Sequence, residues 1–138
     1  MTSQDQTQKK RKPRQPAARD ETGRLRSRTS RWRRSEKGRR GDAARAAVVR
    51  ALRRGDLARP DRCTECGIYC RAEAHHWSYE PKHHERVHWL CRRCHYRADQ
   101  LRASLSSDDQ AYYGVIARAA GLRTAAKLSG RSEMAEMW

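Results

Sequence analysis

The stretches Cys63-Thr64-Glu65-Cys66-Gly67 and Cys91-Arg92-Arg93-Cys94-His95 decide how this chain folds. Each contains a Cys-x-x-Cys pair, and 24 residues separate the two pairs. Two residues between the thiolates let both sulfurs converge on one ion, and glycine can adopt the backbone conformation that such a knuckle often needs. The pattern predicts a closed tetrahedral zinc site on Cys63, Cys66, Cys91 and Cys94. Unliganded reduced cysteines or two disulfides are the alternatives, and they explain the paired spacing less well.

The composition leaves little material for a hydrophobic core. The chain has 138 residues, of which 35% are charged and 36% hydrophobic, and it contains no Phe. This length suffices for one small domain with tails, and so small an apolar content favours a fold held together by a metal. We therefore expect a small domain in which a metal links the segments, and the short strands and helices predicted below make its class α+β.

The charge of the chain points to a polyanionic partner. The net charge is +16, and Arg outnumbers Lys by 26 to 6. Arginine suits bidentate contacts with phosphate, so nucleic acid is the expected partner, and the family resemblance given below narrows this to DNA. Residues 1–60 carry +14 of this charge. The alternative is that a GC-rich coding sequence simply raises the Arg and Ala content.

The cysteines and the hydropathy bear on localisation. No apolar run approaches the ~18 residues of a membrane span, and no signal-peptide pattern is present. Two Cys-x-x-Cys pairs with a single Cys70 suit a reducing compartment better than a secreted disulfide scaffold. These features predict a cytoplasmic protein. Cys70 is a bystander, a spare ligand or a redox-sensitive thiol.

Residues 1–40 are predicted to form a disordered basic arm. They contain 15 Lys and Arg against 4 Asp and Glu, with almost no apolar periodicity. The cluster of Arg31, Arg33 and Arg34 around Trp32 is the densest part and is expected to track phosphates. Trp32 either stacks on a base or docks on the domain.

Residues 41–59 contain a predicted basic amphipathic helix. Asp42 can cap it, the residues up to Arg54 are mostly good helix formers, and Gly55 lies where a C-terminal cap belongs. Its apolar stripe should pack on the metal domain, because so short a helix is marginal alone.

Residues 60–104 should hold the metal domain, with strands over 72–76 and 86–90 and a helix from about 92 to 103. Residues 105–138 are predicted to be a helical extension. One helix should follow a cap within Ser106–Asp109 and run over 110–120, and a second should run over 122–128. The side chains expected to cover the metal domain are those of Tyr112, Val115, Ile116 and Leu122.

Between and after the knuckles lie the pair His75-His76 and the single His95. With the four cysteines, these histidines make residues 50–100 resemble the HNH (ββα-metal) endonucleases. The likeness is greatest to short phage and bacterial members built around a four-cysteine zinc, and the endonuclease VII family shares the frame. The resemblance implies a ββα arrangement and phosphodiester hydrolysis in DNA.

Carried over residue by residue, the resemblance makes His76 the general base. It places His75 and His95 as ligands of a second divalent cation such as Mg²⁺ or Mn²⁺, distinct from the structural zinc. Arg92 and Arg93, at the start of the last helix, suit phosphate contacts near a scissile bond.

The sequence departs from the family pattern at Arg86. An Asn about five residues before the third cysteine often orients the base histidine, and here Arg86 occupies that place. Arg86 can bind phosphate instead, and His88 on the same strand face can assist the ion or the base. Equally, the substitution is consistent with a catalytically inactive zinc module that binds DNA or RNA.

Overall fold

The computed structural model describes residues 32–137 as an α+β fold with one two-stranded antiparallel sheet. The elements in chain order are α2 (Glu36–Arg54), β1 (Glu73–His76), the 3-10 turn η1 (Pro81–His83), β2 (Val87–Leu90), α3 (Arg92–Ser104), α4 (Ser107–Ala120), α5 (Leu122–Leu128) and α6 (Ser132–Ala135). The predicted order of two strands and a helix is observed, and β1, β2 and α3 each lie within one residue of their expected bounds.

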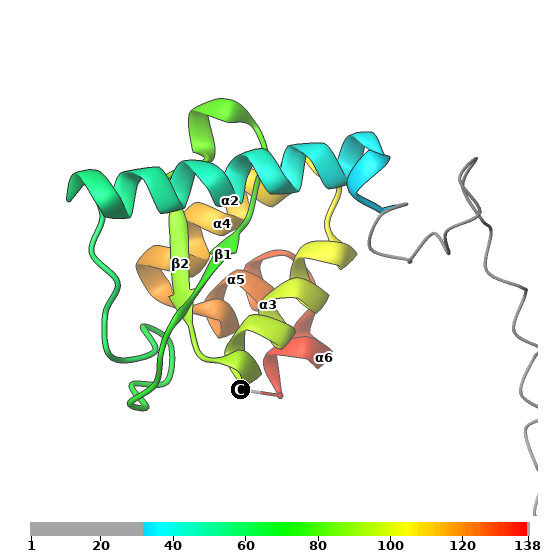
Figure 1. Cartoon of the computed structure of the whole chain (residues 1–138). Coiled ribbons are helices and arrows are strands. Elements are labelled where there is room, and N and C mark those ends of the chain that lie inside the picture. The colour runs from blue at the N-terminus through cyan, green and yellow to red at the C-terminus, as the bar shows by residue number, and fades with distance from the viewer. Residues whose placement is uncertain (1–31, 138) are drawn as a thin grey trace, which may run out of the picture.

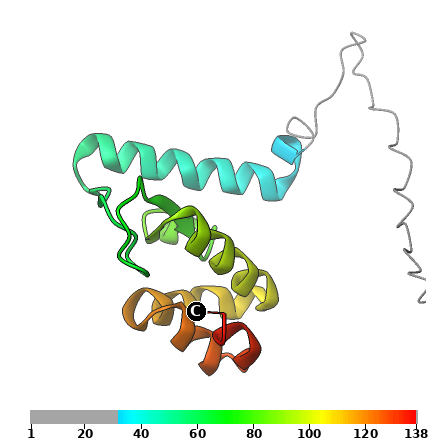
Figure 2. The same ribbon diagram turned by 90° about the horizontal axis from the view of Figure 1, so that it is seen from below.

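The sheet lies between two helical layers (Figures 1 and 2). α2 crosses one face of the hairpin, whereas α3 and the helices α4 to α6 lie on the other side. Strand alternation explains the division, because successive side chains point to opposite faces. Val87 and Trp89 pack with Val48 of α2, and Leu90 packs with Leu101 of α3 in the larger core.

The helix predicted to start at Asp42 begins earlier, so the prediction of a disordered arm over residues 1–40 is wrong for its last residues, and residues 1–31 of that arm lie outside the described part of the chain. α2 starts at Glu36, and the Ser35 side chain caps it by accepting a hydrogen bond from the Gly38 backbone N–H at 3.0 Å. Gly38 and Gly41 look like helix breakers in the sequence, but they make room for Trp32. A Cβ at position 38 would lie 1.8 Å from the Trp32 carbonyl oxygen. The predicted end of the helix at Gly55 is confirmed by its left-handed conformation, with φ of 82°.

The C-terminal helices α4 to α6 pack against the core that contains Cys63 and Cys94, and they do so with smaller side chains than predicted. Leu122 is fully buried and Ile116 packs against the core, but Tyr112 and Val115 are exposed at 63% and 54%. Gly114 instead faces Trp77, where a Cβ would lie 2.4 Å from the Trp77 Cβ. The absence of a side chain at this position lets α4 approach closely, so the expectation for Tyr112 and Val115 is wrong. α6 was not predicted.

Candidate functional site

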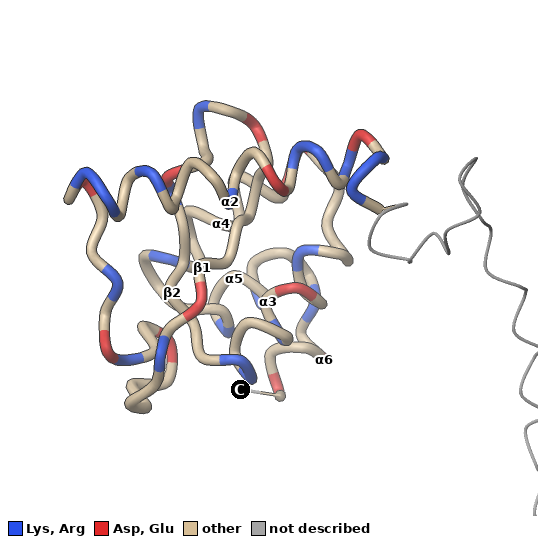
Figure 3. The backbone as a smooth tube through the Cα atoms, in the orientation of Figure 1, with Lys and Arg blue, Asp and Glu red and all other residues tan. Residues whose placement is uncertain are grey.

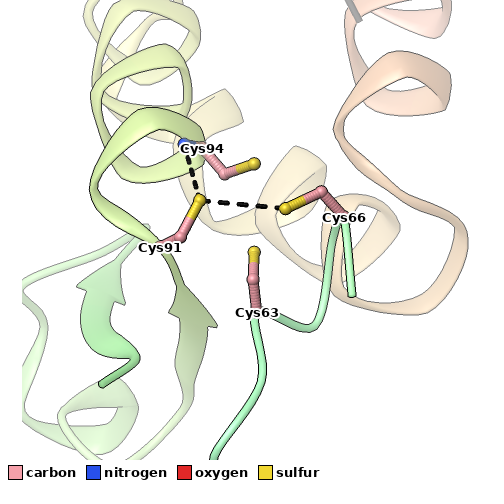
Figure 4. A group of neighbouring side chains, drawn as sticks. All are labelled: Cys63, Cys66, Cys91 and Cys94. Atoms are coloured by element: carbon pink, nitrogen blue, oxygen red, sulfur yellow. Dashed lines mark hydrogen bonds between the residues drawn. The ribbon is translucent and has the colours of Figure 1, made fainter. Parts of the chain in front are cut away.

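The four cysteines of the two Cys-x-x-Cys pairs converge on one point (Figure 4). Cys63 and Cys66 come from the knuckle before the hairpin, and Cys91 and Cys94 come from the start of α3. Their four Sγ atoms all lie within 4.8 Å of one another, and none forms a disulfide. Gly67 follows the first pair in the left-handed region, with φ of 72°, and its N–H donates to the Cys63 carbonyl at 2.9 Å. This cluster is compatible with a single metal ion.

The geometry and hydrogen bonding of the cluster fit zinc. Tetrahedral coordination with Zn–S bonds of about 2.3 Å requires sulfurs about 3.8 Å apart. The Sγ atoms of Cys66 and Cys91 are 3.8 Å apart. Burial opposes ionisation of Cys63, but backbone N–H groups of Cys66, Cys91 and Glu65 outweigh it and lower the Cys63 pKa to about 7. Cys63 is thus favoured as a thiolate, the form that binds metal, whereas the pKa of Cys66 is raised and burial raises the pKa of Cys94, so metal binding would displace their protons.

Two residues inside the first knuckle tie it to distant parts of the fold. Both the N–H and the hydroxyl of Thr64 donate to the Trp89 carbonyl of β2, at 2.9 and 2.7 Å. The carboxylate of Glu65 accepts a hydrogen bond from the Leu122 N–H at the start of α5, at 3.0 Å. Burial raises the pKa of Glu65. The knuckle therefore connects the sheet, α3 and the C-terminal helices.

A second group of potential metal ligands lies where β1 faces α3. His75, His95 and Asp99 each offer a ligand atom, and these atoms lie within 4.8 Å of one another. Nδ1 of His75 is 3.4 Å from Asp99 Oδ1, and Nδ1 of His95 is 3.9 Å from Asp99 Oδ2. The structure thus brings together the two predicted ligands and adds Asp99. Two imidazoles and one carboxylate suit a divalent cation.

His75 is held as a neutral imidazole in this group. His75 is 1% exposed, and its ring makes edge-to-face contacts with the rings of Trp77 and His95. Burial, followed by the charges of His95 and Arg102, lowers its pKa well below the usual range. Its Nε2 is buried without a hydrogen-bond partner. A neutral imidazole keeps a lone pair on one of its two nitrogens, as a metal ligand must.

His76 points to the opposite side of β1, and its ring has a defined orientation. Its Nε2 lies 3.1 Å from the His84 carbonyl oxygen. Because a carbonyl only accepts, Nε2 carries the proton and Nδ1 keeps its lone pair. Burial lowers the pKa of His76, which favours the neutral ring at pH 7. His76 is thus oriented as a group that can accept a proton through Nδ1.

Arg102 and Tyr79 surround His76 at the edge of a groove. Arg102 Nη1 donates to the His76 carbonyl at 2.9 Å, and its Nη2 is 3.4 Å from Asp99 Oδ1. The ring centroids of Tyr79 and His76 are 5.8 Å apart. Both Arg102 and Tyr79 line a groove of about 550 Å³ between the N-terminal part of α2 and the facing parts of α3 and α4. The groove therefore leads to the vicinity of His76.

The N-terminal part of α2 forms the basic side of this groove. Lys37 and Arg40 line it, together with the acidic Glu36. They continue the helical stripe that is apolar over the hairpin, at Ala44 and Val48. Figure 3 shows basic residues along the whole of α2. One face of α2 thus packs in the core where the helix crosses the sheet, and the same face is a cationic surface where the helix extends past the sheet.

The remaining predicted residues lie apart from these two groups. His88 lies opposite His75 in the sheet, is 4% exposed, and has its Nε2 3.9 Å from Glu65 Oε2, outside the group of His75, His95 and Asp99. Cys70 packs between the two cores, outside the four-cysteine cluster.

The arginines predicted to bind nucleic acid are exposed wherever the structure describes them. These are Arg33, Arg34, Arg86, Arg92 and Arg93. Trp32 packs against Gly41 and Arg45, with its ring centroid 5.1 Å from the Arg45 guanidinium, which agrees with docking on the domain. Arg31 lies outside the described residues.

Sequence reasoning missed Asp99 and His84. Asp99 lies one helical turn after His95, so the spacing i, i+4 on the predicted helix was a signal for it. The contribution of His84 is its backbone carbonyl, which no side-chain pattern reports. His83 and His84 belong to the connection between the strands, and His84 Nε2 is 3.1 Å from the Tyr79 carbonyl oxygen.

Comparison with family models, with curated proteins and with solved structures gave no match to this chain. Among residues 32–137, no helix combines the length and the apolar character needed to cross a membrane.

Proposed function

We propose that this chain is a zinc-stabilised, metal-dependent endonuclease of the HNH type that hydrolyses phosphodiester bonds in DNA. The observation that carries the proposal is a pair of features on adjacent residues of β1, whose side chains lie on opposite sides of the strand and which Arg102 links by contacting both Asp99 and the His76 carbonyl. His75 belongs to a group of three potential metal ligands, and His76 is held by a carbonyl in the tautomer that can accept a proton.

The four cysteines would hold a structural zinc, because they leave no position open for water. His75, His95 and Asp99 would hold the second ion, and a divalent cation bound there supplies charge that stabilises a phosphorane-like transition state. Asp99 also lies 3.4 Å from Arg102 Nη2. Arg102 is therefore a positioning residue for Asp99 and for the His76 backbone.

His76 would act as general base. A base must carry a free lone pair toward the water that it deprotonates, and Nδ1 makes no hydrogen bond within the described part of the chain. The His84 carbonyl fixes the ring and stabilises the imidazolium that forms when the proton is taken. His76 is 6% exposed, so only a small molecule such as water reaches it.

The groove beside His76 is the expected path for the substrate strand. Lys37, Arg40 and Arg102 supply positive charge along it, although Arg40 also pairs with Glu80 at 2.6 Å. Exposed Arg92 and Arg93 add charge at the start of α3. Cationic grooves of this kind follow a nucleic-acid backbone and make binding dependent on salt.

The test is nicking of supercoiled plasmid with Mg²⁺ or Mn²⁺ by zinc-loaded protein. Wild type should nick the plasmid, and His76→Ala and Asp99→Asn should not. His84→Ala is the matched control, because it keeps the backbone carbonyl that holds His76 and should retain most of the activity. If His76→Ala nicks as fast as wild type, His76 is not the base.

A catalytically inactive zinc module that binds DNA or RNA is the second candidate. It is favoured by Arg86, which stands where an Asn often orients the base. Metal stoichiometry separates the two functions. A nuclease should bind one tight zinc and a weaker divalent cation that is lost on His95→Ala, whereas a binding module should bind the zinc alone.

A further inference from the structure

A small pocket lies between the end of the hairpin and α4, on the side of the sheet opposite to α2. It is partly open to solvent and offers about 20 Å³ to the centre of a water-sized atom. Since a space of about 10–15 Å³ by this measure holds one water, the pocket admits a single oxygen-sized atom. Its polar side chains come from Ser78, His83, Arg86 and Arg118, and the lining also includes Trp77.

The two arginines of this pocket have no counter-charge. Within residues 32–137, neither Arg86 nor Arg118 makes an ion pair, and Arg118 makes one hydrogen bond, of 3.4 Å, to the Arg86 carbonyl. The carboxylates of the nearby loop are already engaged with α2, Glu80 with Arg40 at 2.6 Å and Glu85 with Arg54 at 3.0 Å. The pocket is therefore cationic without a carboxylate to neutralise it.

The pKa of Arg118 reflects the lack of a carboxylate beside the two arginines in the described part of the chain. Burial, and then the neighbouring charge of Arg86, lower the pKa of Arg118. Two guanidinium groups that repel each other in a partly buried place are stabilised by an anion between them.

Three residues that line the pocket also carry polar atoms with hydrogen-bonding capacity to spare. The Trp77 indole Nε1 is buried without a hydrogen-bond partner, and the Trp77 side chain is 1% exposed. Nδ1 of His83 is likewise buried and unpartnered. The Ser78 oxygen accepts from the Glu80 N–H at 3.2 Å, which leaves its proton available. Buried polar atoms normally have a partner, and the Trp77 indole N–H can only donate, so its lack of a partner on a lining residue favours an acceptor in the pocket.

We propose that this pocket binds a phosphate group, with one oxygen inside and the others at the open mouth against Arg86 and Arg118. Planar guanidinium groups match phosphate geometry, and the neutral donors of the lining supply further contacts. The phosphate belongs either to a nucleic-acid backbone or to a free phosphate compound. The site is separate from the His75 group, and its occupation does not require that the protein cleave DNA.

The test is calorimetric titration of zinc-loaded full-length protein with inorganic phosphate, at constant ionic strength in chloride. Wild type should bind one phosphate per chain. Arg118→Gln should weaken this binding by about tenfold or more, the loss expected for a charge-assisted contact. Arg123→Gln is the matched control, since it removes one positive charge from an exposed position on α5 and should bind as wild type does. Circular dichroism and zinc content verify the fold of each variant.

A second measurement identifies the source of the phosphate. In salt titrations of oligonucleotide binding, loss of one backbone contact lowers the slope of log K against log salt by about 0.7 for single strands and 0.9 for duplex. If Arg118→Gln lowers the slope by this amount more than Arg123→Gln, the site takes a backbone phosphate. If the slopes agree while inorganic phosphate still binds wild type alone, the site takes a free phosphate compound. Absence of phosphate binding by wild type, or equal weakening in both variants, would overturn the proposal.

Discussion

Gly114→Ala tests the close approach of α4 to the hairpin. The new Cβ would lie 2.4 Å from both Cβ and Cγ of Trp77. Carbon atoms pack best at about 3.5–4.0 Å, so α4 or the indole must move by roughly 1 Å. Trp77 is 1% exposed and packed on several sides, so the movement disrupts the larger core.

The expected loss of stability follows from two opposing terms. Overpacking of a core costs about 1–3 kcal/mol and occasionally more, whereas replacing a helix-interior Gly by Ala gains up to about 1 kcal/mol. With so short a contact we expect a net loss of about 2 kcal/mol. For a domain of this size that corresponds to a fall in melting temperature of about 10 °C.

The assay is urea unfolding of zinc-loaded protein, with Gly41→Ala as the matched control. Gly41 is also a helix-interior glycine, but its added Cβ would meet the Trp32 ring at 3.4 Å, close to an ordinary contact. That variant should be more stable than wild type by up to about 1 kcal/mol. If Gly114→Ala is as stable as Gly41→Ala, α4 does not contact Trp77 as described.

Three further predictions concern the knuckle and the second metal group. Cys94→Ser should lose zinc and should no longer unfold cooperatively, whereas Cys70→Ser should keep one zinc per chain. Metal analysis and thermal melts measure this, and equal zinc content in the two variants would exclude Cys94 as a ligand. Glu65→Ala should lower the free energy of unfolding by about 1–2 kcal/mol through loss of the acceptor for the Leu122 N–H, and Glu65→Gln should recover most of it. Asp99→Asn should weaken Mn²⁺ binding in a titration by about tenfold or more without altering zinc content, and unchanged Mn²⁺ affinity would remove Asp99 from the ligand group.

The sequence predicted those features that depend on spacing along the chain. A Cys-x-x-Cys pair identifies a knuckle directly. The two strands before the second pair could be predicted because the chain between the two pairs is short. The α+β class and the four-cysteine cluster are confirmed on this basis. The nuclease activity and the roles of His75, His76 and His95 in it stay predictions.

The features that the sequence did not predict depend on contacts between segments. The first turns of α2 were not predicted, because Gly38 and Gly41 are poor helix formers by residue type. In the structure their missing side chains leave room for Trp32. Tyr112 and Val115 were assigned to the core by hydrophobicity alone, whereas Gly114 decides which face of α4 packs. The orientation of His76 depends on a backbone carbonyl, which has no signature in residue type.

The division of the molecule into two cores has a consequence for its motions. α2 packs on a small core around Val48, Val87 and Trp89, while the four-cysteine cluster belongs to the opposite layer. Local opening free energies follow such packing units, so α2 should exchange its amide hydrogens well before α3 does. Because α2 also forms one wall of the groove beside His76, each such opening widens the groove without disturbing the metal layer. If the groove takes a nucleic-acid strand as proposed, a strand with no free end would enter by this sideways route instead of being threaded.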